Sequence, residues 1–145
     1  MTVKIVKLCE NARIPTYGSV SAAGADLYAC IEQPVTIAPG QTLLVPTGLS
    51  MEIEEGFAGF IYARSGLATK RGLAPANKVG VIDSDYRGQV MVSLHNHSDK
   101  EQTVEPGERV AQIVFAPVYQ AQFVLTDTLE QTERGSGGFG STGTK

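Results

Sequence analysis

The sequence predicts an all-β fold, a jelly roll or distorted barrel with one short helix and a flexible Gly-rich C-terminal arm. Three observations lead to this prediction. Val, Ile and Thr are frequent, and these residue types favour strands. The 16 Gly and 7 Pro divide the chain into short segments. Several of those segments alternate apolar and polar residues, as half-buried strands do.

The alternation is clearest in two segments. In residues 25–31 one face carries Ala25, Leu27, Ala29 and Ile31, and in residues 89–95 one face carries Val90, Val92 and Leu94. Further strands are expected over residues 3–8, 42–45, 49–53, 57–63, 109–115 and 122–125. Turns are expected at Pro39-Gly40, Glu55-Gly56, residues 85–88 and Pro106-Gly107.

One helix and one hairpin complete the predicted elements. The helix covers residues 65–73, about two turns with Ser65 as the N-cap. The hairpin covers residues 77–91 and turns at Ser84-Asp85, where Asp85 is typical turn chemistry. Gly80 and Gly88 bracket this turn and permit close approach of the backbone to a ligand.

Length and composition limit the class of protein. A chain of 145 residues and 15.4 kDa is one domain, with residues 1–133 as the β domain and 134–145 as the arm. The net charge of -3 argues against a nucleic-acid partner. We see no apolar run long enough for a membrane span and no secretory signal. Cys9 and Cys30 form no CxxC motif and no disulfide framework. We therefore expect a cytoplasmic protein.

The arm, RGSGGFGSTGTK, places five glycines around one aromatic residue, Phe139. Such a composition cannot build a core, so simple disorder is one interpretation. The other is a polyphosphate-binding segment, because Arg134, the Ser141 and Thr142 hydroxyls and free glycine amides are groups that wrap phosphates.

Polar residues also interrupt segments that are otherwise typical of a core. Asp26 lies inside an apolar strand, where alternation places it on the solvent face. Arg64 and Ser65 stand at a strand-to-helix junction, which is either an anion site or an ordinary N-cap beside a surface arginine. Arg109 and Gln112 interrupt the strand over residues 109–115.

Asp83 is the candidate general base. It follows Val81 and Ile82, so we expect the carboxylate to be partly desolvated and rigidly held. His95 and His97 are two residues apart on one strand and could chelate a metal. No nearby Cys, Asp or Glu completes a ligand set in the local sequence, so we expect a solvated pair.

Several chemistries are excluded by missing motifs. The sequence has no HxE with CxxC, which excludes zinc deaminase chemistry. It also lacks GxxxxGK[ST] and GxSxG, which excludes the P-loop and serine-hydrolase interpretations.

Five segments together resemble a known family. AGADLYA, ARSGLA, GVIDSDYRG, RVAQ and RGSGGFGSTG are similar, in order and spacing, to the five motifs of the trimeric deoxyuridine triphosphate nucleotidohydrolases, the dUTPases. The resemblance runs from about Ala23 to Gly143. It implies a jelly-roll, β-clip-like fold assembled as a homotrimer with active sites shared between subunits. The implied reaction converts dUTP and water to dUMP and pyrophosphate with Mg²⁺, which supplies dUMP for thymidylate synthesis and keeps uracil out of DNA.

The resemblance also assigns roles to residues. Asp83 would activate the water that attacks the α-phosphorus, and Asp26 would reach Mg²⁺ through water at most. Arg87 matches a variable position and is expected at the surface. The phosphate chain would be held by Arg64, Ser65, Gly66 and Gln112, and closed over by Arg134, Gly140, Ser141 and Thr142.

Specificity would come from the hairpin. Asn77 and the backbone of Val81, Ile82 and Asp83 would match the uracil edge and leave buried groups unpaired against cytosine. Tyr86 would lie beneath the deoxyribose and exclude a 2′-hydroxyl. Met91 would line the same site, and Phe139 would stack on the uracil.

Two rival functions remain at this point. One is a dCTP deaminase-like nucleotide enzyme of the same fold, which would release ammonia from dCTP. The other is a non-catalytic trimeric β binding module, which would need neither a carboxylate at Asp83 nor an ordered arm.

Overall fold

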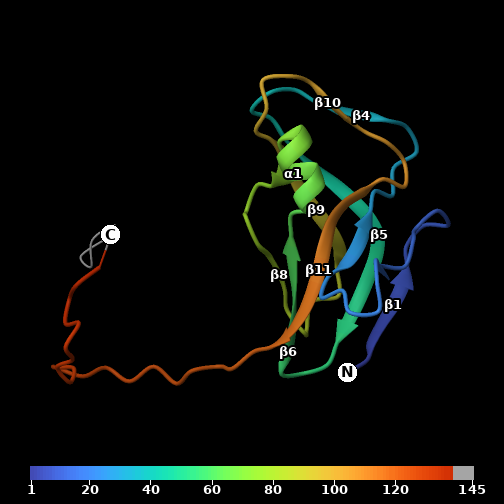
Figure 1. The fold of residues 1–145 in the computed structure, drawn as a ribbon. Helices are drawn as coiled ribbons and strands as arrows, with labels where there is room; N and C mark the ends of the chain where they lie inside the picture. The colour runs from blue at the N-terminus through green and yellow to red at the C-terminus, as the bar shows by residue number, and fades with distance from the viewer. Residues whose placement is uncertain (139–145) are drawn as a thin grey trace.

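The computed structural model describes residues 1–138 of the chain, and Phe139, Gly140, Ser141 and Thr142 lie outside the described residues. Over these residues the chain forms eleven strands and one helix (Figure 1). The first strands are β1 (Val3–Lys7), β2 (Thr16–Tyr17), β3 (Ala25–Tyr28), β4 (Val35–Ile37), β5 (Thr42–Ile53) and β6 (Phe57–Tyr62). After them come α1 (Ser65–Arg71), β7 (Leu73–Pro75), β8 (Gly80–Ile82), β9 (Gln89–Asn96), β10 (Gln102–Val104) and β11 (Arg109–Pro117).

The strands form three sheets. A four-stranded sheet has the order β1-β5-β9-β7, a five-stranded sheet has the order β2-β3-β11-β6-β8, and β10 pairs with β4. All pairs are antiparallel, for example Val45 opposite Val92 and Ile113 opposite Ile61. The predicted all-β class with one short helix is confirmed, although within residues 1–138 the sheets do not close into a barrel.

The predicted alternation builds the core. Ala25, Leu27 and Ala29 are buried, and so are Val90, Val92 and Leu94 on β9. One continuous apolar cluster contains these residues together with Val45, Leu49 and Ile113. Because side chains alternate along a strand, the intervening positions of β3 and β9 point away from this cluster and are available for function.

Strand β5 is longer than predicted. It continues through Pro46 and Gly48, where two separate strands were expected, with a register shift between Pro46 and Ser50 against β9. Gly48 has a φ of 68°, and a Cβ there would lie 2.6 Å from the sulfur of Cys9 and 2.7 Å from that of Cys30. These two sulfurs form a disulfide that the sequence analysis did not predict. Glycine is therefore required at this bulge by both backbone conformation and space.

Three local predictions are wrong. Residues 122–125 form no strand, because within the described chain β11 ends at Pro117 and the following residues have no strand to pair with. The N-cap of α1 is Arg64 instead of Ser65, and no side chain caps the helix start. The turn at Ser84-Asp85 is present, but its flanking strands do not pair as a hairpin, since β8 joins β6 in one sheet and β9 joins β5 in the other.

Residues beyond β11 leave the core as an extended segment (Figure 1). Several large apolar side chains of this segment are almost wholly exposed, namely Tyr119, Phe123, Leu125 and Leu129. Among residues 1–138 no helix is long and apolar enough to cross a membrane.

Candidate functional site

Two clusters contain the described residues that the sequence analysis selected. The first lies where β3, β6 and β11 meet beside the start of α1, and it is rich in arginine. The second lies in the turn between β8 and β9, and it combines a carboxylate with apolar side chains.

The first cluster is built around Asp26. Arg64 Nε donates to Asp26 Oδ1 at 2.7 Å, and Arg109 Nη1 donates to Oδ2 at 3.1 Å. The Asp26 side chain is only 13% exposed, whereas that of Arg109 is 52% exposed. The expectation that Asp26 faces solvent is therefore wrong, because two cations on neighbouring elements cover its carboxylate.

Gln112 completes this cluster. It faces Asp26 on β3 and Tyr62 on β6, and its Nε2 donates to the carbonyl of Ala63 at 2.9 Å. The exposed Ser65 and Gly66 form the first turn of α1 next to Arg64. A Cβ at Gly66 would have no neighbour within 4 Å, so the backbone here is open to a ligand. Two guanidinium groups, an amide and a hydroxyl thus gather at one corner, a set suited to binding phosphate.

The second cluster forms a pocket of about 290 Å³ in the turn after β8. It is lined by Val81, Ile82, Asp83, Tyr86, Gln89 and Met91. Five of these residues were selected from the sequence, and Gln89 was not. Gln89 accepts a hydrogen bond from the Gly48 amide at 3.1 Å, so it ties the pocket to the bulge of β5. The sequence offers no signal for this contact, which depends on the register between β5 and β9.

Tyr86 shapes the turn. Its hydroxyl donates to the Gln89 carbonyl at 3.0 Å, and a Cβ at Gly88 would overlap the phenol oxygen and lie 2.5 Å from the carbon that carries it. The ring therefore packs on the backbone of Gly88, and glycine leaves the necessary space. Arg87 is exposed as expected, and it donates to the carbonyls of Ser84 and Tyr86 at 2.7 and 3.1 Å. The turn between β8 and β9 is thus held by several hydrogen bonds.

Asp83 is exposed in the single chain, so the expected partial desolvation is not present. Asp83 nevertheless lines the pocket after β8. Asn77 lies in the tight turn before β8, with Lys78 at a φ of 63°. Its Nδ2 atom lies over Gly80, 3.3 Å from where a Cβ would stand. The glycine predicted to permit close approach thus makes room for Asn77.

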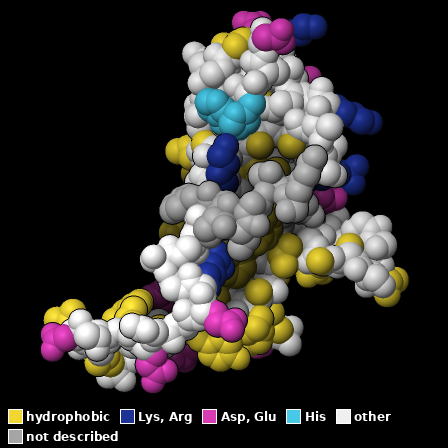
Figure 2. Space-filling model, turned by 60° about the vertical axis from the view of Figure 1, so that its left-hand side comes forward, with side chains coloured by type: hydrophobic (Ala, Val, Ile, Leu, Met, Phe, Trp, Pro, Cys, Tyr) yellow, Lys and Arg dark blue, Asp and Glu magenta, His cyan; other side chains and the backbone are white. Residues whose placement is uncertain are grey.

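Arg134 is the one residue of the arm's proposed phosphate set within the described chain, and its Nε donates to the Gly137 carbonyl at 2.9 Å. His95 and His97 belong to neither cluster. They lie on the outer face of β9 and on the residue after it, with ring centres 4.4 Å apart (Figure 2).

An all-β scaffold with an arginine-rich corner and a carboxylate in a partly apolar pocket defines a class, that of hydrolases for phosphorylated substrates. Comparisons with known proteins specify this class further. The dUTPase family profile matches residues 10–143. The deoxyuridine 5′-triphosphate nucleotidohydrolase of Photorhabdus laumondii is 53% identical over 97% of this chain and 95% of its own length. That of Thiobacillus denitrificans is 49% identical over 99% of both chains.

Solved structures of dUTPases have a fold similar to that of this chain. A point mutant of the dUTPase of Staphylococcus bacteriophage 80alpha, solved with dUpNHpp, has a TM-score of 0.89, with 26% identity over 98% of both chains. A point mutant of the dUTPase of Staphylococcus aureus phage phi11, studied for the coordination of a structural Mg(II) ion, has a TM-score of 0.80 over 90% of this chain, with 23% identity. The chain belongs to the dUTPase family, and it is a dUTP diphosphatase.

Proposed function

We propose that hydrolysis of dUTP to dUMP and pyrophosphate by this chain proceeds through Mg²⁺-dependent attack of water on the α-phosphorus, with Asp83 as the general base. The reaction would supply dUMP for thymidylate synthesis and keep uracil out of DNA. The observation that carries this mechanism is the pocket after β8, in which Asp83 lies with Val81, Ile82, Tyr86 and Met91. The carboxylate thus lies beside apolar and aromatic side chains suited to contact a nucleoside.

Asp83 suits the role of base for two reasons. The turn that carries Asp83 is fixed by the hydrogen bonds of Tyr86 and Arg87. The Asp83 side chain is exposed, so a water molecule can reach it. A carboxylate within hydrogen-bond reach of that water accepts its proton as the oxygen attacks the α-phosphorus and the bond to the leaving pyrophosphate breaks.

The arginine-rich corner would bind the phosphate chain. Arg64 supplies a cation and Ser65 a hydroxyl. Gly66 leaves its backbone accessible, and Gln112 supplies an amide. Asp26 orients Arg64 through the 2.7 Å bond, so the guanidinium is positioned before the substrate arrives. The positive charge would stabilise the negative charge that develops on pyrophosphate.

Mg²⁺ would enter with the triphosphate. Among residues 1–138 no cluster of three or more His, Cys, Asp or Glu side chains could cage the ion. Both oxygens of Asp26 face arginines, yet each keeps a lone pair for a water molecule, so Asp26 fits an indirect contact. When bound, the ion neutralises phosphate charge and so eases departure of pyrophosphate.

Selectivity would arise in the pocket after β8. Asn77 and the backbone of Val81, Ile82 and Asp83 would pair with the uracil edge, which cytosine cannot match without leaving buried groups unpaired. The Tyr86 ring, 43% exposed and packed on Gly88, would lie under the deoxyribose. Met91, 37% exposed, would contact the same nucleoside.

The separation of the two clusters supports a site shared between chains. Ile82 pairs with Gly59 near the start of β6, and Arg64 lies five residues further along the chain. Along the rest of β6, which ends at Tyr62, and the two residues after it, that is a backbone separation of at most roughly 16 Å at about 3.3 Å per residue. Asp83, one residue beyond Ile82, lies further still from Arg64. A backbone separation of this size favours a complete site that combines the base of one chain with the arginines of another.

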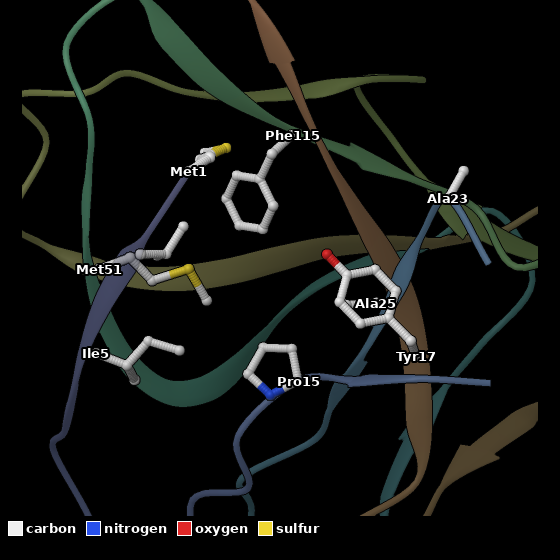
Figure 3. A pocket seen from close by; sticks show the side chains of 9 residues that line it. Met1, Ile5, Pro15, Tyr17, Ala23, Ala25, Met51 and Phe115 are labelled. Atoms are coloured by element: carbon white, nitrogen blue, oxygen red, sulfur yellow. The ribbon is translucent and has the colours of Figure 1, made fainter. Parts of the chain in front are cut away.

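We therefore propose a homotrimer, with β domains over residues 1–133 and arms over residues 134–145. The exposed apolar side chains of the segment after β11 need a partner in water. A pocket of about 380 Å³, lined mainly by apolar side chains, lies beside β1, β2 and β3, and Tyr17, Met51 and Phe115 point into it (Figure 3). The segment after β11 of a neighbouring copy would occupy this pocket.

The arm would then reach a neighbouring site. Arg134, Gly140, Ser141 and Thr142 would close over the phosphates, and Phe139 would stack on the uracil. A Gly-rich segment suits this task, because it can wrap a substrate without a core of its own.

One experiment tests the proposal. Pyrophosphate release is measured with dUTP, dTTP, dCTP and UTP, each with and without Mg²⁺, and ammonia is measured with dCTP. We expect pyrophosphate from dUTP with Mg²⁺ and little from the others. Ammonia from dCTP would show a deaminase, and no turnover of any nucleotide would show a binding module.

A further inference from the structure

The two histidines form an exposed pair that the proposed reaction does not use. His95 is the last but one residue of β9, and His97 follows the strand on the same face. Their side chains lie together on the surface, with a Lys or Arg side chain directly below them in the view of Figure 2. They are the only histidines of the chain.

The backbone that carries the pair is rigid because Asn96, between them, is fully buried and makes four side-chain hydrogen bonds. Its Nδ2 donates to the carbonyls of Ile37 and Lys100 at 2.8 and 2.7 Å. Its Oδ1 accepts from the amide and hydroxyl of Ser98 at 2.9 and 2.7 Å. In addition, the His97 amide donates to the Gly72 carbonyl at 2.8 Å. The two Cα atoms are therefore held in fixed positions.

The His95 ring is also oriented. Thr42 lies opposite His95 on β5, and its Oγ1 is 2.8 Å from His95 Nδ1. If Nδ1 carries the proton and donates to Thr42, Nε2 presents its lone pair away from the strand. A hydrogen bond of this kind to the other ring nitrogen is how proteins orient a metal-binding histidine. Ala74, the opposite neighbour of His95 on β7, is too small to cover the ring.

The spacing of the rings matches one coordination geometry. Their centres lie 4.4 Å apart, with an angle of 62° between the planes. With metal–nitrogen bonds of about 2.1 Å, two imidazoles bound to one ion at a right angle have ring centres roughly 4.5 Å apart, and at a tetrahedral angle roughly 5.2 Å. The observed distance favours the right angle, which is typical of square-planar, tetragonal or octahedral ions rather than four-coordinate zinc.

The charge state of the pair agrees with this geometry. The pKa of His97 lies below its ordinary value, because desolvation disfavours the charged ring and the neighbouring His95 and Lys78 act in the same direction. A neutral imidazole is the form that binds metals. Lys78 is also a cation that a bound metal ion would face, so it limits the affinity.

We propose that His95 and His97 together form a binding site for a late first-row divalent metal ion, Ni²⁺ or Cu²⁺, with water in the remaining coordination positions. The site is separate from the residues that we assign to dUTP hydrolysis. Since nitrogen ligands prefer Cu²⁺ over Ni²⁺ and Zn²⁺, and Mg²⁺ prefers oxygen, the order of affinity is Cu²⁺ first, then Ni²⁺ and Zn²⁺, with no Mg²⁺ binding at this pair.

The test uses the full chain without a histidine tag, stripped with EDTA and titrated calorimetrically with the chloride of each metal. His95→Gln and His97→Gln should each weaken Ni²⁺ and Cu²⁺ binding about 10-fold or more, since loss of an outer contact alone costs 10- to 100-fold in many sites. Electron paramagnetic resonance of the Cu²⁺ complex should show splitting from two imidazole nitrogens, and from one in either variant. Far-UV circular dichroism checks that the variants remain folded.

Two further variants separate a built site from simple adsorption. Thr42→Val keeps both ligands and the side-chain shape, yet should weaken binding several-fold by releasing the His95 ring. Lys78→Gln removes a cation and should strengthen binding, most visibly at low salt. Wild-type affinity in both histidine variants, or a Cu²⁺ spectrum without imidazole splitting, would overturn the proposal.

Discussion

The side chain of Gln112 lies directly over Gly24, so that a Cβ at position 24 would overlap its Oε1 atom and stand 3.1 Å from Cδ. The same side chain donates to the Ala63 carbonyl at 2.9 Å, one residue before Arg64. Gly24 therefore determines where the amide of Gln112 lies in the arginine-rich corner. The atom that would overlap, Oε1, belongs to the flexible end of the side chain, whereas Gln112 Cβ, 3.2 Å away on β11, would have to shift by only a few tenths of an ångström.

This relationship predicts that Gly24→Ala impairs catalysis more than stability. The added methyl should push Gln112 out of the phosphate-binding set, and loss of one substrate-positioning contact costs about 10- to 100-fold in kcat/KM. The free energy of unfolding should change by about 1 kcal/mol, because the amide of Gln112 can swing away and its Cβ, fixed on β11, has to shift only slightly. Steady-state kinetics and urea denaturation measure the two effects.

Gly18→Ala is the matched control. A Cβ at Gly18 would meet no atom within 4 Å, so this variant adds the same methyl without touching Gln112. It should keep the parent kcat/KM. If both alanine variants were equally active, Gln112 would have no role in holding the phosphates.

A second prediction concerns the choice of sugar. UTP should be a very poor substrate beside dUTP, because its 2′-hydroxyl would meet the Tyr86 ring. Tyr86→Ala should narrow that preference, while Tyr86→Phe keeps the ring and should retain it. The comparison also controls for the hydrogen bond from the Tyr86 hydroxyl to the Gln89 carbonyl, which both variants lose. The ratio of kcat/KM for dUTP and UTP is the readout, and an unchanged ratio in Tyr86→Ala would remove Tyr86 from the specificity argument.

Much of the architecture could be predicted from alternation and turn residues. Leu27 and Val92 were correctly placed in the core, and the turn at Ser84-Asp85 was correctly located. The pairing of β8 with β6, instead of with β9, could not be predicted, because strand partners distant in sequence depend on tertiary packing. The same limit explains Asp26, whose local alternation predicts exposure but whose carboxylate is covered by arginines 38 and 83 residues away.

The candidate site shows a similar division. Motif residues such as Asp83 and Met91 come together in one pocket because they are close along the chain. Arg109 interrupts an apolar strand and was noted for that reason, but its partner Asp26 becomes evident only in the folded chain. The distance between Asp83 and Arg64 within one chain also cannot be inferred from the local sequence, because it depends on the register between β6 and β8.

A third prediction concerns stability at acid pH. The pKa of His97 is lowered in the folded chain, chiefly by desolvation and then by His95 and Lys78. The unfolded chain, with an ordinary histidine pKa of about 6.5, therefore binds this proton more readily. Well above pH 6.5, His97 does not make the free energy of unfolding depend on pH. Below about pH 6.5, the unfolded chain takes up the proton first, so the free energy of unfolding should fall as the pH falls.

His97→Gln should make this decrease shallower, as measured by urea denaturation at several pH values between about 5 and 8. In His95→Gln, titration of the His97 ring by NMR should show its pKa shifted back toward the ordinary value, because one of the causes has been removed. If the free energy of unfolding of His97→Gln fell with pH as steeply as that of the parent, the decrease could not be assigned to His97.

The last prediction tests the shared active site. Asp83→Asn keeps the shape of the side chain but cannot accept a proton, so turnover should fall by roughly 10²- to 10⁴-fold. Deletion after Glu133 should leave the β domain folded, because the core cluster of the described chain lies wholly before this point. It should still cripple turnover through loss of the arm. The two variants are thus inactive for different reasons. The truncated chain retains Asp83 but lacks the arm, and the Asp83→Asn chain retains the arm but lacks the base.

Mixed trimers made by co-refolding should therefore regain activity. A site that takes its base from a truncated chain and its arm from an Asp83→Asn chain is complete, and the distance between Asp83 and Arg64 within one chain favours such sharing. Assembly of the mixed species is confirmed by native mass spectrometry, which resolves the truncated and full-length chains. An arm that served only its own chain would give no rescue, so confirmed mixed trimers with no activity above either parent would rule out the shared site.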